Sequence, residues 1–344
     1  MTTGDHRSPY LVGPIYDWAF FLLPPVGALF IGILISGTRF STDAITLFGM
    51  REPAAGFLIG TVIHAHLVAV VFRSHGNSDI FRLYPRRFVL VPVLLWMAIY
   101  ASVTVAVLAT VVATFWDVWH SGAQTFGFAR IYDRNAGVPP ESGRRLDFWL
   151  NQLLYAGPIL AGVSLADHIG VVGDIGEVGP ALFSDVPAFV EGHQRYLTWT
   201  ILAGGTGFVL YYVWHAWRRH RMGHHQSFAK VFLVASTGFC SIYTWGFNTW
   251  GEAFFIMNLF HAVQYLGLVW HTEKRGIIRR LRVQNRRGGA AIALMVFVAS
   301  VMAYGFGAEV LNPDISSLWA VTMVVSLMHF WYDAFIWSVR KRQI

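Results

Sequence analysis

The residues of this sequence that could carry chemistry are histidines placed inside apolar segments. His329 and Asp333 stand four positions apart near the end of the printed chain, in a segment that is otherwise apolar. Residues at this spacing lie above one another on one face of a helix. Such a pair can bind a metal ion together, or the carboxylate can orient an imidazole that binds one. The alternative is structural, with Asp333 near a helix end and paired with Arg340 or Lys341.

Other histidines share a depth with His329. The chain has fourteen histidines, and His64, His120, His261 and His329 each precede the next lysine or arginine by nine to thirteen residues. In a helix this separation is about 14–20 Å, which places the four imidazoles in one layer near the middle of a membrane. Ionisable residues at that depth usually face the interior of a helix bundle and serve a function. We therefore predict a metal site formed by these residues: His64, His66, His120, His261, His329 and Asp333.

An alternative to metal binding is a hydrogen-bonded or proton-relaying network of the same histidines. His64 and His66 are also only two positions apart in the sequence. This spacing corresponds to about 200° around a helix. A regular helix therefore directs only one of the two side chains inward, and the sequence does not identify which.

Further polar residues are placed to support such a site. Asp117 and Gln124 share a helix face with His120, and Asn258 and Tyr265 share one with His261. A histidine that binds a metal usually donates its second ring N–H to a carboxylate, an amide or a carbonyl group, which orients the ring. A second, shallower layer nearer the basic ends of the helices is expected from three more histidines: His75, His215 and His271.

The composition indicates the elements that position these side chains. Of 344 residues, 55% are hydrophobic and 13% are charged, and the mean hydropathy is +0.48. Soluble proteins carry about 25% charged residues. We predict an all-α, polytopic membrane bundle in a single domain over residues 1–344. Ten apolar segments approach the roughly 20 residues needed to cross a bilayer: 15–36, 53–72, 88–108, 111–130, 148–167, 195–217, 230–248, 251–271, 290–308 and 316–338. The stretch 88–130 is interpreted as two spans with a tight turn near 108–111.

The distribution of charge predicts the orientation of the bundle. Lys and Arg gather in four connecting segments, 73–87, 130–147, 218–230 and 272–289, whereas segment 167–192 is acidic. Because cytoplasmic loops are enriched in Lys and Arg, we expect the four basic segments and both termini to be cytoplasmic. The acidic segment is then an external loop. This explains the formal net charge of +7 without nucleic-acid binding, and it predicts the inner membrane if the protein is bacterial.

One short stretch resembles a known family. HAWRRHRMGHHQ (215–226) contains H-x4-H from His215 to His220 and H-x3-H-H from His220 to His225. These spacings resemble the histidine boxes of integral-membrane fatty-acid desaturases and alkane hydroxylases, which are non-haem di-iron enzymes. The resemblance covers about a dozen residues and implies a cytoplasm-facing iron site. The other histidines of this chain are dispersed singly, whereas that family has several separate boxes.

These observations together predict a membrane-embedded, metal-dependent oxidoreductase. Non-haem iron, mononuclear or dinuclear, suits the imidazole and carboxylate ligands, with copper, zinc or haem b as alternatives. The expected partners are O2, an electron donor and a lipid, isoprenoid or other apolar substrate, which indicates a role in lipid metabolism. The alternative functions are a b-type haem protein for electron transfer and a proton- or metal-coupled transporter.

Overall fold

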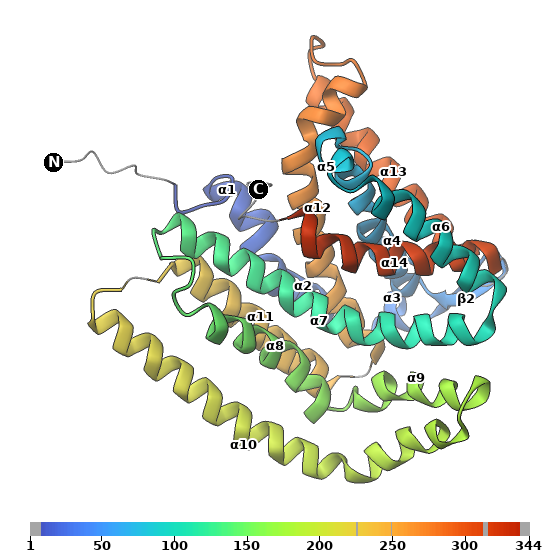
Figure 1. Cartoon of the computed structure of the whole chain (residues 1–344), viewed down its shortest axis with the longest axis vertical. Helices are drawn as coiled ribbons and strands as arrows, with labels where there is room; N and C mark the ends of the chain where they lie inside the picture. The colour runs from blue at the N-terminus through green and yellow to red at the C-terminus, as the bar shows by residue number, and fades with distance from the viewer. Residues whose placement is uncertain (1–7, 225, 249, 312–315, 338–344) are drawn as a thin grey trace. The chain divides into compact units, whose positions relative to one another are not determined.

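The chain is almost entirely helical in the computed structural model, which describes residues 8–224, 226–248, 250–311 and 316–337 (Figure 1). The first part contains α1 (Pro14–Asp17), η1 (Trp18–Leu22), α2 (Pro24–Ile35), α3 (Arg39–Thr42), β1 (Ala44–Leu47), β2 (Met50–Pro53), α4 (Ala54–Ser74), α5 (Ser78–Leu83), α6 (Pro85–Ala101) and α7 (Val103–Asn135). The second part contains α8 (Arg144–Ala161), α9 (Leu165–Val178), η2 (Ala181–Asp185), α10 (Val186–Arg221), α11 (Phe228–Phe247), α12 (Trp250–Arg280), α13 (Gly289–Leu311) and α14 (Ser316–Ile336). The prediction of an all-α fold is confirmed, apart from the short antiparallel hairpin β1–β2.

Six helices of the described chain are long and apolar enough to cross a membrane, namely α4, α7, α11, α12, α13 and α14. Two bent pairs raise the number to eight if each is one span: α1–η1 with α2, bent by 50°, and α8 with α9, bent by 81°. The protein is therefore a multi-pass membrane protein with six to eight candidate spans. The two other predicted segments form α6 and α10, which are helical but are not candidate spans within the described residues.

The described chain divides into two compact units, and the single membrane domain stays a prediction. The first unit comprises residues up to Ile33, Phe115–Gly176 and Ala181–Phe260, and the second comprises Leu34–Thr114, Glu177–Pro180 and His261 onward. Each unit combines segments that are far apart in the sequence.

Helix α8 is the centre of the first unit, and α10 and α11 both pack against it. Helices α8 and α10 are antiparallel, because the Thr198 hydroxyl donates to the Ala161 carbonyl near one end and the Tyr212 hydroxyl donates to Asp147 near the other. Two buried carboxylates, Asp133 and Asp147, lie at the second of these ends, and Lys230 contacts each of them at 2.8 Å. Buried charges with opposite partners of this kind hold helix ends in a fixed register.

In the second unit, α13 and α14 pack against α4, and α14 also packs against α6. The backbones of α4 and α13 approach closely at Gly305. A side-chain carbon at this position would overlap the carbonyl oxygen of Thr61. Small residues permit such close backbone contact between membrane helices. Helix α4, which carries His64 and His66, is therefore positioned by direct contact with α13.

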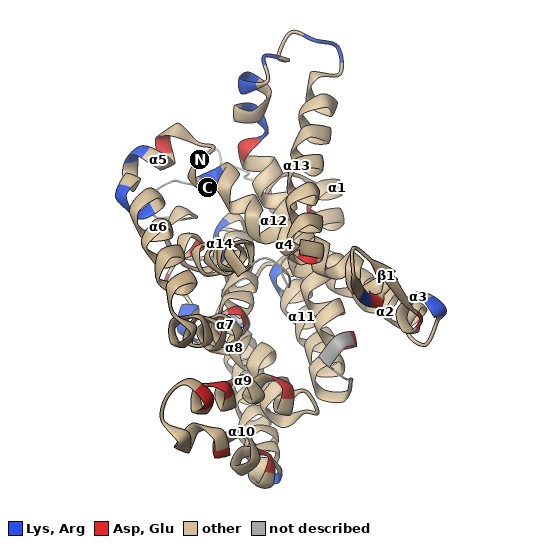
Figure 2. Ribbon diagram, turned by 90° about the vertical axis from the view of Figure 1, so that its right-hand side faces the viewer, with Lys and Arg blue, Asp and Glu red and all other residues tan. Residues whose placement is uncertain are grey.

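Two connections differ from the prediction. The helix break in stretch 88–130 lies at Ser102 rather than near 108–111, because Ser102 is extended (φ −141°, ψ 117°) and its hydroxyl accepts the N–H of Val105 at the start of α7. A serine at a helix N-terminus is a common start signal. The acidic segment 167–192, predicted as a loop, is largely helical and contributes to α9 and the start of α10, where Figure 2 colours several ribbon positions red for Asp and Glu.

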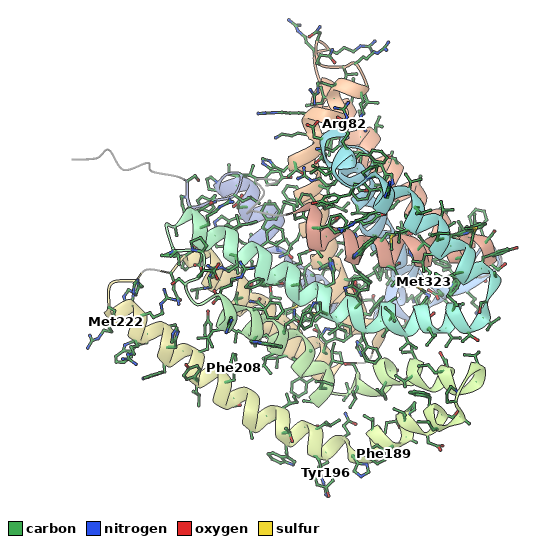
Figure 3. The ribbon with its side chains drawn as sticks, viewed as in Figure 1. Arg82, Phe189, Tyr196, Phe208, Met222 and Met323 are labelled. Atoms are coloured by element: carbon green, nitrogen blue, oxygen red, sulfur yellow. The ribbon has the colours of Figure 1, made fainter. Side chains whose placement is uncertain are left out.

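Apolar side chains cover much of the surface of the helices. On α10, for example, Phe189 and Tyr196 project outward (Figure 3) and are 66% and 60% exposed. Large exposed apolar surfaces are unusual in water-soluble proteins. In a multi-pass membrane protein they are the surfaces that lipid covers.

Candidate metal centre

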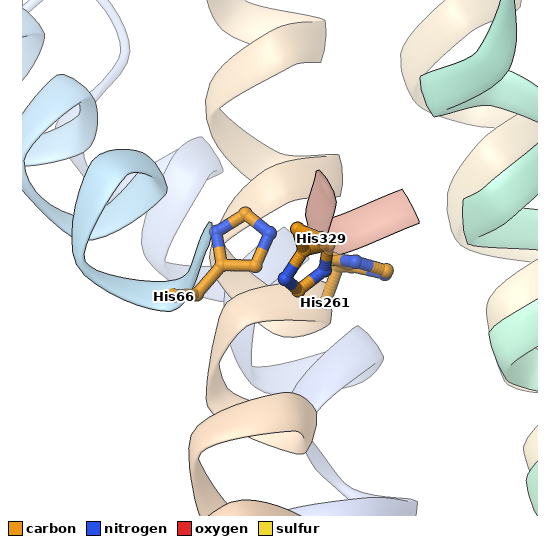
Figure 4. A group of neighbouring side chains, drawn as sticks. All are labelled: His66, His261 and His329. Carbon is orange, nitrogen blue, oxygen red and sulfur yellow. The ribbon is translucent and has the colours of Figure 1, made fainter. Parts of the chain in front are cut away.

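Three histidines from three helices of the second unit meet in its interior. His66 comes from α4, His261 from α12 and His329 from α14, and one ring nitrogen of each lies within 4.8 Å of the others. Figure 4 shows the three rings close together, and the space between these nitrogens is the common point of the candidate site. The His66 ring centroid is 5.2 Å from that of His261 and 5.2 Å from that of His329. A metal with Zn–N-type bonds of about 2.0–2.1 Å holds its nitrogen ligands roughly 3.3–4.1 Å apart, so a small contraction would bring all three to one ion.

The three imidazoles are removed from solvent. His66 and His261 are 1% exposed, and His329 is 0% exposed. Neither ring nitrogen of His66 makes a hydrogen bond to any part of the chain that the structure describes. A buried polar side chain without a partner costs about 1–3 kcal/mol. A metal ion at the common point would satisfy a nitrogen of His66.

The orientation of His329 is fixed by the backbone of α4. Its Nδ1 atom lies 3.2 Å from the carbonyl oxygen of Leu67, the residue after His66. A carbonyl oxygen only accepts hydrogen bonds, so Nδ1 carries the ring proton and Nε2 carries the lone pair. This is the tautomer that a metal-binding histidine needs when its second nitrogen is anchored by a carbonyl group.

Asp333 lies one helical turn after His329 and is held by two donors. The Tyr265 hydroxyl and the Trp337 indole N–H both donate to Oδ1 of Asp333, at 2.9 and 2.8 Å. Its second oxygen, Oδ2, is 3.9 Å from Nε2 of His329. This distance is too long for a direct hydrogen bond. It is within the range expected for two atoms that bind one metal ion or one bridging water.

A buried ion pair contacts Trp337, one of the two donors to Asp333. The Arg73 guanidinium lies 4.7 Å from the centre of the Trp337 ring and donates to Glu273 at 2.6 Å. Asn77 also donates to Glu273. These contacts link α4 to α12 and α14, the helices that carry the three histidines.

His64 faces a different neighbour from His66. Its Nε2 atom is 3.5 Å from the Glu309 carboxylate on α13, and the structure does not place it among the three converging histidines. The two side chains diverge because α4 remains a regular helix through both residues. Of this pair, His66 is therefore the one directed to the common point.

Four other residues predicted for the site lie in the first unit. His120, Asp117, Gln124 and Asn258 belong to the first unit, and their participation stays a prediction. His120 and Asn258 are buried there, at 6% and 4% exposure.

The three histidines of the predicted second layer have different surroundings within their own units, and the layer itself stays a prediction. His75 is held by two hydrogen bonds, to the Ser74 hydroxyl and the Phe88 carbonyl, so both of its ring nitrogens have partners. His271 is half-buried on α12 of the second unit, and His215 lies on α10 of the first. Of the histidine-box stretch, His225 lies outside the described residues, as do Arg340 and Lys341, the predicted alternative partners of Asp333.

Sequence reasoning missed three features of this site. Trp337 is four residues after Asp333, a spacing that could have indicated it as a partner. The contributions of the Leu67 carbonyl and of Glu273 depend on how helices pack together, and no local pattern in the sequence marks them.

Comparisons with known proteins give no further assignment. No family model, no curated protein and no solved structure matches this chain. The functional argument therefore depends on the residues and their geometry.

Proposed function

We propose that this protein is a membrane-embedded oxidoreductase that uses a non-haem iron ion held by His66, His261 and His329. The observation that carries the proposal is the convergence of three buried imidazoles from three separate helices. Asp333 either completes the ligand set or orients His329. A buried imidazole is costly to maintain unless its polar atoms have partners, and a metal ion would supply one to His66, whose ring nitrogens make no hydrogen bond within the described chain.

The number of histidines favours a single ion over haem. A porphyrin supplies four nitrogen ligands itself and leaves two axial positions for the protein. Here three ring nitrogens lie within 4.8 Å of one another, which is one more than haem accepts. Three converging imidazoles therefore favour a single metal ion over a b-type haem.

The ligand types favour iron, copper or zinc. Imidazole suits all three metals, and a nearby carboxylate favours iron because oxidases and oxygenases combine histidine with Asp or Glu. The sequence has one cysteine, so a cluster held by several thiolates of this chain is excluded. Three histidines, with or without Asp333, leave coordination positions for O2 and for water.

The surrounding helices favour an apolar substrate. The three ligands come from α4, α12 and α14, all of which are candidate membrane spans. A lipid or isoprenoid dissolved in the bilayer can reach such a site sideways, without passing through water. The electrons would come from a donor on the cytoplasmic side or from a quinol.

The test is metal analysis of the full-length protein, purified in detergent without added metal, together with its absorption spectrum. We expect about one iron per chain and no Soret band. Reconstitution with ferrous iron under nitrogen, followed by nitric oxide, should give the EPR signal of a high-spin iron–nitrosyl complex, which requires an open coordination position. A Soret band would replace this proposal with a haem protein. A metal-free protein that does not bind ferrous iron would contradict it and favour a transporter.

A further inference from the structure

A basic cavity lies in the first unit, at the end where α8 begins and α10 finishes. Its volume is about 470 Å³. The basic side chains that line it are Arg144 and Arg145 from α8, His215 and Arg219 from α10, and His224 from the following turn. Glu141 is the one acidic residue of the lining. The cavity therefore has an excess of positive charge.

The three arginines are available to bind an anion. Within the described part of the chain, none of them lies within 4 Å of a carboxylate oxygen. The Arg219 guanidinium donates to the Ser142 hydroxyl, and that of Arg144 lies over the Phe126 ring. The nearby carboxylates Asp133 and Asp147 are already paired with Arg130 and Lys230. The positive charge in the cavity is therefore not neutralised by these buried acids.

The start of α8 adds further donors to the same cavity. Gly143 precedes this 18-residue helix with φ of 67° and provides no side-chain cap for its first N–H groups. The first N–H groups of a helix and its dipole favour an anion. A side-chain carbon at Gly143 would also approach the Arg219 guanidinium at 3.0 Å. Glycine thus keeps the helix start open beside the arginine.

An apolar cavity lies farther along the same pair of helices. It also has a volume of about 470 Å³, and its lining is mainly aliphatic and glycine residues of α8 and α10, with three residues of α11. Leu153, Gly157 and Gly205 form part of its wall. The glycines leave the space that larger side chains would fill. This second cavity therefore offers an apolar surface without charged groups.

We propose that the first unit binds one anionic phospholipid, with its phosphate in the basic cavity and an acyl chain in the apolar cavity. From Arg145 to Leu153 is eight residues, or about 12 Å along the helix. The hydrocarbon of one leaflet is roughly 15 Å deep. An acyl chain attached to a phosphate at Arg145 therefore reaches the apolar cavity.

Charge and shape together identify this class of ligand. Basic pockets between membrane helices bind anionic lipid headgroups, and planar guanidinium groups bind phosphate through paired hydrogen bonds. Free phosphate would use the basic cavity alone. A phospholipid uses both cavities, and the antiparallel packing of α8 and α10 places them along one helix pair.

The test measures lipid binding to the full-length protein in detergent by native mass spectrometry. The probes are phosphatidylglycerol, phosphatidylcholine and inorganic phosphate. Wild type should bind one phosphatidylglycerol in preference to phosphatidylcholine. The variant Arg145→Gln/Arg219→Gln should bind it at least about tenfold more weakly, because each arginine near an anionic lipid contributes about 1 kcal/mol.

The matched control is Arg218→Gln/Arg221→Gln, which removes the same amount of charge, here entirely from the last turn of α10. These two arginines lie over Trp214 and Trp217 and do not line the cavity. The control should retain wild-type affinity. If the double cavity variant does not fold, Arg145→Gln alone provides the comparison, because Arg145 is exposed.

Three outcomes would overturn the proposal. Equal losses in the cavity variant and the control would indicate general charge attraction. Equal binding of the two phospholipids would show that the arginines do not select the headgroup. Displacement of phosphatidylglycerol by millimolar inorganic phosphate would show that the acyl chain contributes nothing and that the ligand is a free anion.

Discussion

Nδ1 of His329 lies 3.2 Å from the carbonyl oxygen of Leu67, so the ring of one candidate ligand is oriented by the residue that follows another, His66. The contact joins α14 to α4 through a backbone group rather than a side chain. A shift of α4 should therefore move His66 and, at the same time, weaken the hydrogen bond between the Leu67 carbonyl and His329. Metal affinity and the packing of these helices are expected to change in parallel.

The first prediction is that iron binding requires His66 and does not require the nearby His64 and His75. His66→Ala should reduce bound iron to less than about a tenth of wild type, because it removes one of the three proposed ligands. The protein should still insert and fold, since substitution also removes a buried group without hydrogen-bond partners. The measurement is iron per folded protein after size-exclusion chromatography.

The control for this prediction is His75→Ala. Both ring nitrogens of His75 have hydrogen-bond partners, so its removal should lower the melting temperature and leave the iron content unchanged. His64→Ala should also retain iron, because His64 lies beside Glu309. Loss of iron in His64→Ala but not in His66→Ala would contradict the assignment of the two residues.

The second prediction concerns the close approach of α4 and α13. Gly305→Leu should destabilise the protein by about 1–3 kcal/mol or more, because the new side chain overlaps the backbone of α4 at Thr61. Iron affinity should fall as well, since α4 carries His66. Thermal unfolding in detergent and an iron titration measure the two effects.

Gly307→Leu is the matched control on the same helix. The space around Gly307 is open to 4 Å, so the same substitution should leave both the melting temperature and iron affinity near wild type. A similar loss in both variants would show that α13 tolerates no added side chain anywhere, and that contact with α4 is not the cause.

Much of the helical fold can be predicted from the sequence. Each apolar segment must satisfy its backbone hydrogen bonds internally when it enters a bilayer, which makes it a helix. Hydropathy is uniform across Ser102, so it predicts the helix break near 108–111, six residues or more too late, whereas the serine itself is a local start signal for α7. The Gly and Pro content of the acidic segment 167–192 predicts a loop, yet α9 includes several of these glycines.

The candidate site was predictable to a similar degree. Depth counting places His261 and His329 in one layer, since similar distances from a basic helix end give similar heights, and in the structure their ring nitrogens lie within 4.8 Å of each other. It could not decide between His64 and His66, because that choice depends on the rotation of α4 against α13. The pairing of Tyr265 with Asp333 joins α12 and α14, and a single sequence has no signal for a contact between two side chains 68 residues apart.

The third prediction tests the buried ion pair near the site. Glu273→Gln should destabilise the protein by about 3–5 kcal/mol, because it leaves the Arg73 guanidinium buried with a weaker partner. The double variant Arg73→Met/Glu273→Leu should recover much of the stability, since no buried charge remains. Chemical unfolding of the single and double variants forms the measurement. Equal destabilisation in both would show that packing, not charge, is lost.

The fourth prediction concerns orientation in the membrane. In a Cys240→Ala background, a cysteine at Gln284 should react with an impermeant maleimide only after the cells are opened, and a cysteine at Pro180 should react in intact cells. Both positions are exposed on the protein. Gln284 lies in the connection between α12 and α13, between Arg282 and Arg286 in the sequence, and Figure 2 colours Lys and Arg positions of this region blue. Labelling of position 284 in intact cells would reverse the topology.

The last prediction assigns the role of Asp333. If Asp333 orients His329 or a bound water, Asp333→Asn should keep the metal but weaken its affinity by roughly 10–100-fold, the usual cost of losing such a partner. If Oδ2 binds the ion directly, the loss should equal that of His329→Ala. Tyr265→Phe separates these cases further, because it removes a donor to Oδ1 and leaves Oδ2 in place. A fall in melting temperature with unchanged iron affinity in Asp333→Asn would mean that the carboxylate only holds Tyr265 and Trp337, and α14 would then contribute His329 alone. The measurement is iron competition with a chelator of known affinity, combined with thermal unfolding of each variant.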